Sequence, residues 1–533
     1  MGKVWEKDYD ELNDFEKLKL KQDGLDILEK LSEYKESGFE SITPKERDLL
    51  KWAGVYVQRP RTEGYFLLRV KIPGGVMNSQ QARVLADISK KYGRGIIDLT
   101  TRQAIQFRWI TIETLPEIMD TLRQVNLHTI ESCGDCPRTV IGNPLAGIDP
   151  DETMDTREIV QQVFEYFQEN REFSNLPRKF KISISANVDN TGHAQINDIA
   201  FTPAVKREGE KEVYGFHVYV GGGLSSKPQL GQRLNFFIHP QDVLKVSIAV
   251  ATLFRDYGYR SNRRQARLKF LLADWGREKF ETELLKLTGP LESEGIDLTR
   301  GWNAGYFYGV HPQKQPGLNY VGLSVPVGRL SAEDLLEITQ CADIYGDGSL
   351  RTCNSKNLVL ANIPTETIEA LLAEPIIVKF TPYPKSFIGY TMSCTGKEFC
   401  NLAPVETKNF ALKIAQYLDE KFELDTPLRI HVNGCQNSCA QLHIADIGLR
   451  GMLGKWNGET VEKFELSIGG QLGIDAGFAI PLEGAVPAAQ VPEVLVEFIE
   501  FYKSNKRHQE EFHDFVSRLG AQAFQDLLNP HLN

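Results

Sequence analysis

Four of the eight cysteines stand in two close pairs whose spacing suits a metal centre. Five residues separate Cys394 from Cys400, three separate Cys435 from Cys439, and 34 residues lie between the pairs. Soft thiolate ligands in this number favour an iron–sulfur cluster or zinc over hard cations. The first pair is wider than the spacing of about two to four residues found in most zinc knuckles, and Gly434 gives the backbone freedom to donate amides to sulfur. The pattern predicts a [4Fe–4S] cluster; structural zinc, or cysteines that only pack, are the alternatives.

Several basic side chains gather on predicted strands. A strand over 65–72 turns Arg69 away from its apolar face, and a strand over 176–181 aims Lys179 and Lys181 in the same direction. A third strand carries three polar side chains on one side, namely Arg102, Gln106 and Arg108. Like charges held together repel, so they are either solvated at the surface or stabilised by an anion between them. Because exposed Lys and Arg are ordinary on strands that face water, both interpretations stay open from the residues alone.

The cysteine motifs also carry a family resemblance. Cys394-Thr-Gly-Lys-Glu-Phe-Cys400 and Asn433-Gly-Cys-Gln-Asn-Ser-Cys439 resemble the cluster signature of the sirohaem-dependent sulfite and nitrite reductases. Further matching segments run from about residue 52 to about residue 477. The resemblance implies a sirohaem beside the [4Fe–4S] cluster, whose metal ligands are the four cysteines. It also implies that the sulfur of Cys439 ligates both the cluster and the sirohaem iron, which makes the two centres one electronic unit.

The same resemblance assigns the basic residues to a site. It places four cations around an anionic substrate, namely Arg69, Arg138, Lys179 and Lys181. It assigns sirohaem contacts to Arg102 and Gln106, and Arg108 on the same strand side is a further candidate. Gly222 lies in a glycine run that either lets backbone approach the macrocycle or forms a flexible turn. Because sirohaem carries eight carboxylates, more basic residues are expected around it; the run 260–269 is a candidate that an exposed basic helix explains equally well.

The expected reaction is the six-electron reduction of sulfite to sulfide. The motif Cys133-Gly-Asp-Cys-Pro-Arg138 resembles the bacterial ferredoxin-dependent sulfite reductases. Sulfite-reducing members resemble this chain in having Lys at 179 and 181, whereas plant-type nitrite reductases usually carry Asn at the second position. We therefore prefer sulfite and keep nitrite as the alternative. A rival of another class is an electron-transfer iron–sulfur protein without sirohaem, which needs the cysteines but not the four cations.

No flavin or nicotinamide fingerprint introduces a helix, so the electrons are expected from another protein. The resemblance indicates ferredoxin or a similar low-potential donor. A small acidic donor needs a basic docking patch, for which 503–507 is a candidate that a solvated helix end explains better.

An internal repeat organises the chain. The segment from Tyr65 can be laid against the segment from Tyr320, and two later segments also match in the same order, with a period of about 250 residues. The pattern predicts an α+β fold, internally duplicated about a pseudo-twofold axis, with three domains. A helical extension (1–50) has no repeat partner, and its Lys and Glu runs are expected to form a solvated face. Half-domain 51–128 is expected to pair with 310–385, residues 129–309 to bind sirohaem and substrate, and residues 386–533 to bind the cluster and end in helices.

The composition limits the classes of protein to which the chain can belong. A chain of 533 residues is too long for a single hydrophobic core. Its content of 41% hydrophobic and 25% charged residues is typical of globular proteins. The net charge of −10 argues against a nucleic-acid partner. The longest apolar stretch, around 243–254, is too short for a bilayer, and the N-terminus lacks an apolar signal core. With cysteines in metal-like spacing, these features predict a cytoplasmic location.

The other four cysteines are expected to pack. Cys133 and Cys136 are spaced like a redox pair, but without a thioredoxin-like context we interpret them as buried thiols near the cofactor. Cys341 and Cys353 are interpreted as core. Because some members of the family link a Tyr to a Cys, we hypothesise that Cys133 approaches Tyr56.

Overall fold

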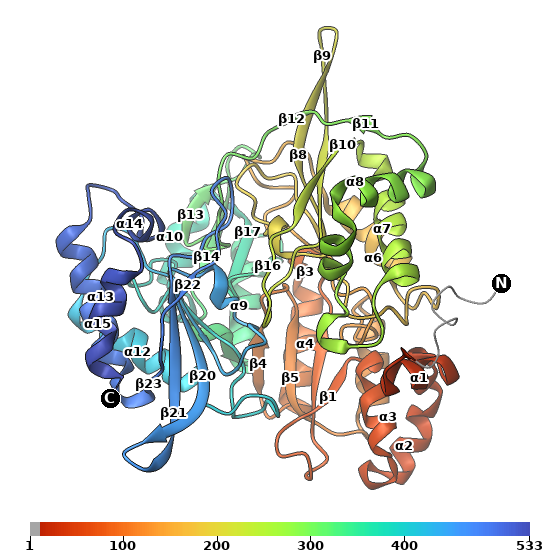
Figure 1. The fold of residues 1–533 in the computed structure, drawn as a ribbon, viewed down its shortest axis with the longest axis horizontal. Coiled ribbons are helices and arrows are strands. Elements are labelled where there is room, and N and C mark those ends of the chain that lie inside the picture. Colours follow the sequence, from red (N-terminus) through yellow and green to blue (C-terminus); the bar gives the residue numbers. More distant parts are fainter. Residues whose placement is uncertain (1–10, 533) are drawn as a thin grey trace.

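The computed structural model describes residues 11–532, which form four β-sheets in two similar pairs (Figure 1). The first five-stranded sheet has the order β1 (Val55–Val57), β2 (Phe66–Val70), β5 (Ile105–Ile110), β4 (Ile96–Leu99) and β15 (Arg329–Ser331). The second has the order β13 (Gly309–Pro312), β14 (Leu318–Leu323), β17 (Leu358–Pro364), β16 (Ser349–Thr352) and β3 (Val76–Asn78). Each sheet takes its last strand from the other half of the chain, β15 against β4 and β3 against β16. This exchange joins the two half-domains.

One helix of each half-domain packs against its counterpart. These are α4 (Ser79–Tyr92) and α9 (Ala332–Tyr345), which contact each other. Both begin with a reciprocal capping box, Asn78 with Gln81 and Ser331 with Asp334. The repeated segments of the sequence thus form the same strand–turn–helix unit twice.

The other two sheets repeat a second pattern. One has the order β11 (Glu292–Ser293), β10 (Gln232–Ile238), β9 (Lys211–Val220), β8 (Ile199–Glu208), β7 (Ile182–Ile184) and β6 (Ile141–Gly142), with β12 (Ile296–Asp297) on β8. The other has the order β18 (Thr391–Ser393), β19 (Ile430–Asn433), β20 (Ile447–Trp456), β21 (Glu459–Ile468) and β22 (Ile480–Pro481), with β23 (Val486–Pro487) on β21. In each, two parallel pairings lead into a long antiparallel hairpin. The predicted duplicated α+β fold is confirmed.

Helices cover these sheets and close the molecule (Figure 1). The helices of the first half are α5 (Leu115–Arg123), α6 (Arg157–Phe167), α7 (Val243–Tyr257) and α8 (Leu268–Thr288). Those of the second half are α10 (Ile368–Ala373), α11 (Pro375–Lys379), α12 (Lys408–Lys421), α13 (Val491–Asn505), α14 (Phe512–Leu519) and α15 (Gln522–Leu528). No helix within residues 11–532 combines the length and apolar composition that a bilayer-spanning segment needs.

The N-terminal extension is more than a solvated charged surface. It forms α1 (Asp14–Lys21), α2 (Leu31–Ser37) and α3 (Pro44–Leu49). Glu16 and Lys19 of α1 are buried, and they form ion pairs with Arg260 at 2.6 Å and with Asp135 at 3.4 Å, respectively. The sequence-based interpretation of a solvated face is wrong for these two residues, because their partners come from distant segments. The extension therefore braces the loop that carries Arg138.

Asp98 ties the half-domains to the cluster domain. This buried carboxylate on β4 forms ion pairs with Arg108 of β5 at 2.7 Å, Arg329 of β15 at 2.8 Å and Lys408 of α12 at 3.4 Å. Burial opposes ionisation, but these three cations together lower the pKa of Asp98 well below its usual range. Arg108 also donates to the hydroxyl of Thr395, next to Cys394. One carboxylate thus compensates three charges at the junction.

We expect Asp98→Asn to destabilise the fold by about 3–5 kcal/mol, because it leaves buried cations without a counter-charge. The midpoint of urea unfolding measures this loss. Asp343→Asn is the matched control, since Asp343 of α9 pairs with Arg83 of α4 at the surface, where a pair contributes less than about 1 kcal/mol. Equal shifts in both variants would contradict the role of Asp98.

Candidate active site

The four motif cysteines meet at one edge of the second pseudo-symmetric sheet. Cys394 directly follows β18, and Cys435 and Cys439 follow β19. Because β18 and β19 are parallel, with Ser393 opposite Val432, their carboxyl ends lie at the same edge. The amide of Gly434 donates to the sulfur of Cys394 at 3.2 Å, and the amide of Leu402 donates to the sulfur of Cys400 at 3.4 Å. The backbone freedom expected of Gly434 is used in this way.

The thiols of this group influence one another. The pKa of Cys435 is raised to about 11, first by burial and then by the negative forms of Cys439, Cys394 and Cys400. Among the described residues, no three His, Cys, Asp or Glu side chains come close enough to hold one metal ion. A cubane takes one thiolate at each of four irons. The four thiols at this sheet edge therefore supply the donor set of the predicted [4Fe–4S] cluster.

Arg69 and Arg138 converge in the first half of the chain. Arg69 on β2 stands opposite Gln106 on β5 in the antiparallel pairing. Its guanidinium donates to the carbonyl of Ser132 at 3.1 Å, and the guanidinium of Arg138 donates to the same carbonyl at 2.8 Å. The structure therefore brings together residues that are far apart in the sequence.

Lys179 and Lys181 lie beside Arg138, because residue Pro137 forms a parallel bridge with Phe180. The predicted strand over 176–181 is wrong, because the chain bends at 177–178 and β7 begins only at Ile182. Neither ammonium group forms a hydrogen bond or an ion pair within the part of the chain that the structure describes. Burial and then the cations Arg267, Arg178 and Arg138 lower the pKa of Lys179 to about 7, while Cys439 opposes the shift. Burial and neighbouring cations, Arg102 first, lower the pKa of Lys181 well below its usual range. Lys179 is thus within electrostatic reach of Cys439.

Arg102 lies between the two halves of the site. Its guanidinium donates to Asn197 at 2.8 Å and to the carbonyl of Thr139 at 2.6 Å. The neighbouring Thr101 donates from its hydroxyl to the carbonyl of Cys439 at 3.2 Å. Burial first, then Arg138 and other cations, lower the pKa of Arg102 to about 9. The segment expected to contact sirohaem therefore touches the cysteine expected to bridge the two cofactors.

This arrangement fits a highly anionic cofactor. The first half contributes cations that are within electrostatic reach of one another, namely Arg69, Arg102, Arg138, Lys179, Lys181 and Arg267. Asp198 is the carboxylate among the groups that influence Lys181 and Arg102. Buried like charges are stable only when anions compensate them. The tetrapyrrole with eight carboxylates and the anionic substrate that the resemblance implies would supply this compensation.

Some predicted residues have other partners. Arg108 is fully buried and bound to Asp98, so its face of β5 serves the junction described above. Gly222 packs against its own chain, since a Cβ there would meet the carbonyl of Gln195 at 2.3 Å. In the run 260–269, Arg260 pairs with Glu16 and Arg263 with Asp135 at 2.7 Å. Each of these residues thus has a contact within the protein that accounts for it without a cofactor.

Sequence reasoning missed one buried cation near the cysteines. Lys356 is 6% exposed and donates to the carbonyl of Ser393. Burial lowers its pKa, which Cys394, Asp98 and Cys439 oppose. The repeat carries a signal for it, because Lys356 occupies the place of Gln103, and both residues have positive φ, 66° and 55°. Such a backbone conformation is uncommon for residues with side chains and marks a site worth examining.

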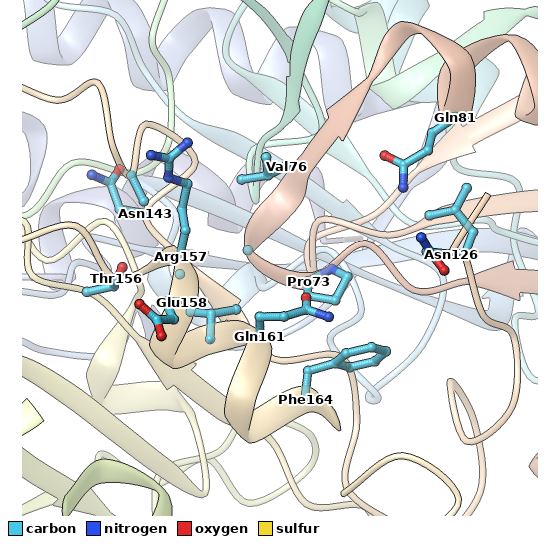
Figure 2. Close-up of a pocket in the computed structure, with 15 residues that line it drawn as sticks. Pro73, Val76, Gln81, Asn126, Asn143, Thr156, Arg157, Glu158, Gln161 and Phe164 are labelled. Atoms are coloured by element: carbon cyan, nitrogen blue, oxygen red, sulfur yellow. The ribbon is translucent and has the colours of Figure 1, made fainter. Parts of the chain in front are cut away.

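A cavity of about 390 Å³ lies away from this site (Figure 2). It is lined by Pro73 and Val76 on one side and by Thr156, Glu158 and Phe164, at and within α6, on the other. None of the predicted site residues lines it. The site is therefore defined by its charges and thiols, not by this cavity.

The remaining four thiols are buried. Cys341 and Cys353 lie in hydrophobic clusters, as predicted. Cys136 donates to the carbonyl of Cys133 at 2.9 Å, and both thiols are free, which confirms them as packed thiols. Tyr56 lies against Cys133: burial and then the Cys133 thiol raise the pKa of the phenol. The predicted approach of Tyr56 and Cys133 is confirmed, whereas a covalent link stays a prediction.

Two family models match this chain. One, described as the nitrite and sulphite reductase 4Fe-4S domain, matches residues 133–289 and 386–533. The other, described as the nitrite/sulfite reductase ferredoxin-like half domain, matches residues 58–125 and 311–376. Each model therefore matches once in each half, in agreement with the duplication.

Similar proteins cover nearly the whole chain. It is 41% identical to a ferredoxin–nitrite reductase of Synechococcus elongatus, over 96% of this chain and 98% of that protein. It is 37% identical to a chloroplastic ferredoxin–nitrite reductase of Oryza sativa, over 96% and 89% of the two chains. The solved structure of the NirA protein of Mycobacterium tuberculosis has a TM-score of 0.90 at 33% identity, covering 96% of this chain and 97% of that chain. The named relatives favour nitrite over the sulfite that the motifs led us to prefer.

The family resemblance predicts a covalent bond between Tyr56 and Cys133, which would make the intact chain lighter by two hydrogen atoms. Mass spectrometry of the intact protein measures this difference. Cys133→Ser should show the full mass of its own sequence, and Cys136→Ser, which alters the neighbouring buried thiol, should retain the deficit. An intact mass of the wild-type protein without this deficit would contradict the link.

Proposed function

Because the chain belongs to the nitrite and sulfite reductase family, we propose that it reduces nitrite to ammonium with six electrons from ferredoxin. The family also confirms that it is an oxidoreductase and that its cofactors are the predicted sirohaem and [4Fe–4S] cluster. The curated relatives at 41% and 37% identity are named for nitrite and for ferredoxin, which supports both parts of the proposal.

One observation carries the proposal. The ammonium groups of Lys179 and Lys181 have no protein partner among the described residues, and Lys179 lies within electrostatic reach of Cys439. A partly buried cation without a counter-ion is costly, so a site that holds two of them beside two arginines is built to bind an anion. Nitrite is such an anion.

We assign the metal and cofactor contacts as follows. Cys394, Cys400, Cys435 and Cys439 would hold the cluster, with Cys439 shared with the sirohaem. Arg102 and Gln106 would contact the tetrapyrrole, Arg102 through a carboxylate. When bound, the sirohaem supplies an iron for the substrate, and the cluster supplies electrons one at a time.

The cations act on the substrate. Arg69 and Arg138 are held in place by the carbonyl of Ser132, so they present fixed donors to the anion. The pKa of Lys179, about 7, lets this group donate a proton near neutral pH and regain it from solvent. Its neighbour Lys181, whose pKa burial and neighbouring cations lower, adds positive charge when a bound anion favours its protonated form.

Sulfite is a second candidate substrate, and Lys181 favours it. Sulfite carries more negative charge than nitrite, and the resemblance to sulfite-reducing members rests on a second lysine at this position. An extra buried cation has more to compensate when the bound anion is more highly charged.

Steady-state kinetics with nitrite and sulfite, using a reduced low-potential donor, test the proposal. We expect a higher kcat/KM with nitrite. A preference for sulfite would replace the primary proposal with the second candidate, and no turnover of either anion would contradict both.

Lys181→Asn tests the specificity argument. We expect it to lower kcat/KM for sulfite by about ten- to a hundredfold, the range expected for a lost charge-assisted contact, and to lower kcat/KM for nitrite less. Lys181→Arg, which keeps the charge, is the control. Equal losses with both anions would contradict a role for Lys181 in discrimination.

The donor would dock at the loop that carries Cys400. Leu402 beside this cysteine is exposed, and the loop contacts Arg59, whose guanidinium donates to the carbonyl of Ala403 at 3.1 Å. Arg61 is exposed two residues farther on. By contrast, the earlier candidate segment 503–507 contacts the 423–425 loop, through Lys503 with the carbonyl of Glu423 and Lys506 with Asp425. An apolar residue with arginines nearby, next to a cluster ligand, suits a small acidic donor.

Arg61→Glu should raise the KM for ferredoxin about tenfold at low ionic strength, because charge complementarity steers association. Turnover with a small chemical reductant should remain unchanged. Lys503→Glu is the matched charge reversal at the other candidate surface and should leave the KM for ferredoxin unchanged. The reverse pattern would move the docking site to α13.

A further inference from the structure

The two copies of the repeat contain the same buried carboxylate in the same backbone setting. In the first copy the amide of Lys181 donates to Asp198 at 2.8 Å, and the amide of Ile199 donates to the carbonyl of Lys181 at 3.1 Å. In the second copy Arg429 and Asp446 form the equivalent amide bond, also 2.8 Å, and Ile447 donates to the carbonyl of Arg429 at 3.1 Å. Lys181 and Arg429 are therefore equivalent positions at the start of equivalent strands.

Their side chains differ in whether they are neutralised. The guanidinium of Arg429 binds Asp446 with two hydrogen bonds, of 2.8 and 2.5 Å. The ammonium of Lys181 forms no ion pair with Asp198. Instead, Arg267 binds both oxygens of Asp198, with Nε at 3.0 Å from Oδ1 and Nη2 at 2.8 Å from Oδ2. Asp446 is therefore bound by the arginine whose amide it accepts, whereas Asp198 is bound by an arginine from another segment.

Arg267 also has an equivalent in the second copy. It is the residue before α8, and Glu511 is the residue before α14. The two helices are matched by their contacts: a Cβ at Gly221 would meet Leu272 of α8, and one at Gly469 would meet Val516 of α14. Leu272 follows Arg267 by five residues, as Val516 follows Glu511. Glu511 adds a negative charge near Arg429, whereas Arg267 adds a positive charge near Lys181.

We propose that Arg267 is a positioning residue that keeps Lys181 free for the anionic substrate by occupying Asp198. Asp198 is fully buried and must be compensated. With Arg267 in place, both carboxylate oxygens are bound from the side of α8. Without it, the Lys181 ammonium is the cation on the same strand start that can turn to Asp198, as Arg429 does to Asp446.

The surroundings of Arg267 are shaped for this contact. Its side chain is 9% exposed, and a Cβ at Gly223 would stand 3.0 Å from its Nη2. A glycine at 223 thus leaves room for the guanidinium, which is a reason for the glycine run that the sequence alone left open.

The inference rests on the proposed function, which places Lys181 in the anion site, and three variants test it. The dissociation constant of nitrite, and in parallel of sulfite, is measured by absorption titration of the oxidised holoenzyme. We expect Arg267→Met to raise this constant about tenfold, in the range of a lost charged contact. Lys181→Met should do the same, and combining both should add little, because they remove the same free cation. Additive losses would overturn the role of Arg267.

A rescue separates positioning from a general structural role. Asp198→Asn together with Arg267→Met removes both the carboxylate that could bind Lys181 and the arginine that occupies this carboxylate. Anion affinity should therefore return to within about threefold of wild type. Arg267→Lys, which keeps a cation beside Asp198, should also retain affinity. Failure of both would overturn the inference.

Two controls complete the design. Glu511→Gln changes the equivalent residue of the second copy and should leave the dissociation constant unchanged; a tenfold change there would contradict the comparison of the copies. If Lys181→Met itself leaves anion affinity unchanged, the proposed placement of Lys181 fails. If only Arg267→Met leaves it unchanged, that placement stands and the present inference fails.

Discussion

A concentration of partly buried positive charge is the constraint on which the site depends. Cations from five separate segments of the first half lie within electrostatic reach of one another, and Asp198 is already bound to Arg267. Such charges repel, and burial makes the repulsion stronger. They can be held together only by a rigid scaffold and by anions that bind between them. The substrate and the carboxylates of the cofactor are therefore part of the electrostatic balance of the fold.

The scaffold meets this constraint with ion pairs that compensate other buried charges within the protein. Asp98 neutralises cations at the junction with the cluster domain, and Glu16 and Lys19 form a buried network with Asp135 behind the loop of Arg138. Strand exchange between the half-domains fixes the distance between the two halves. Within residues 11–532, Lys179 and Lys181 keep no hydrogen-bond or ion-pair partner, and Lys179 lies within electrostatic reach of Cys439.

Local patterns in the sequence predicted the parts of the site that are set by local geometry. The cysteine spacing predicted one metal cluster held by four thiols, and alternation along a strand placed Arg69 away from the apolar side. Alternation gives a side but not a partner, which is why Arg108 was assigned to the cofactor although Asp98 binds it. The burial of Glu16 and Lys356 depends on distant segments and leaves no periodic signal. Substrate choice depends on small charge differences, so the motifs favoured sulfite while the relatives favour nitrite.

Duplication explains how one backbone can carry two opposite electrostatic environments. Both copies retain the carboxylate that accepts a hydrogen bond from the amide at the start of the strand, so the backbone arrangement is the same in both. What differs is the residue before the following helix, Arg267 in one copy and Glu511 in the other. Where that residue is positive, it binds the carboxylate and leaves the strand cation available. Where it is negative, the strand cation is bound by the carboxylate of its own copy and serves the fold. A lysine in place of an arginine on the strand, together with a change of charge at a helix start, thus separates an anion-binding lysine from a structural ion pair without a change of fold.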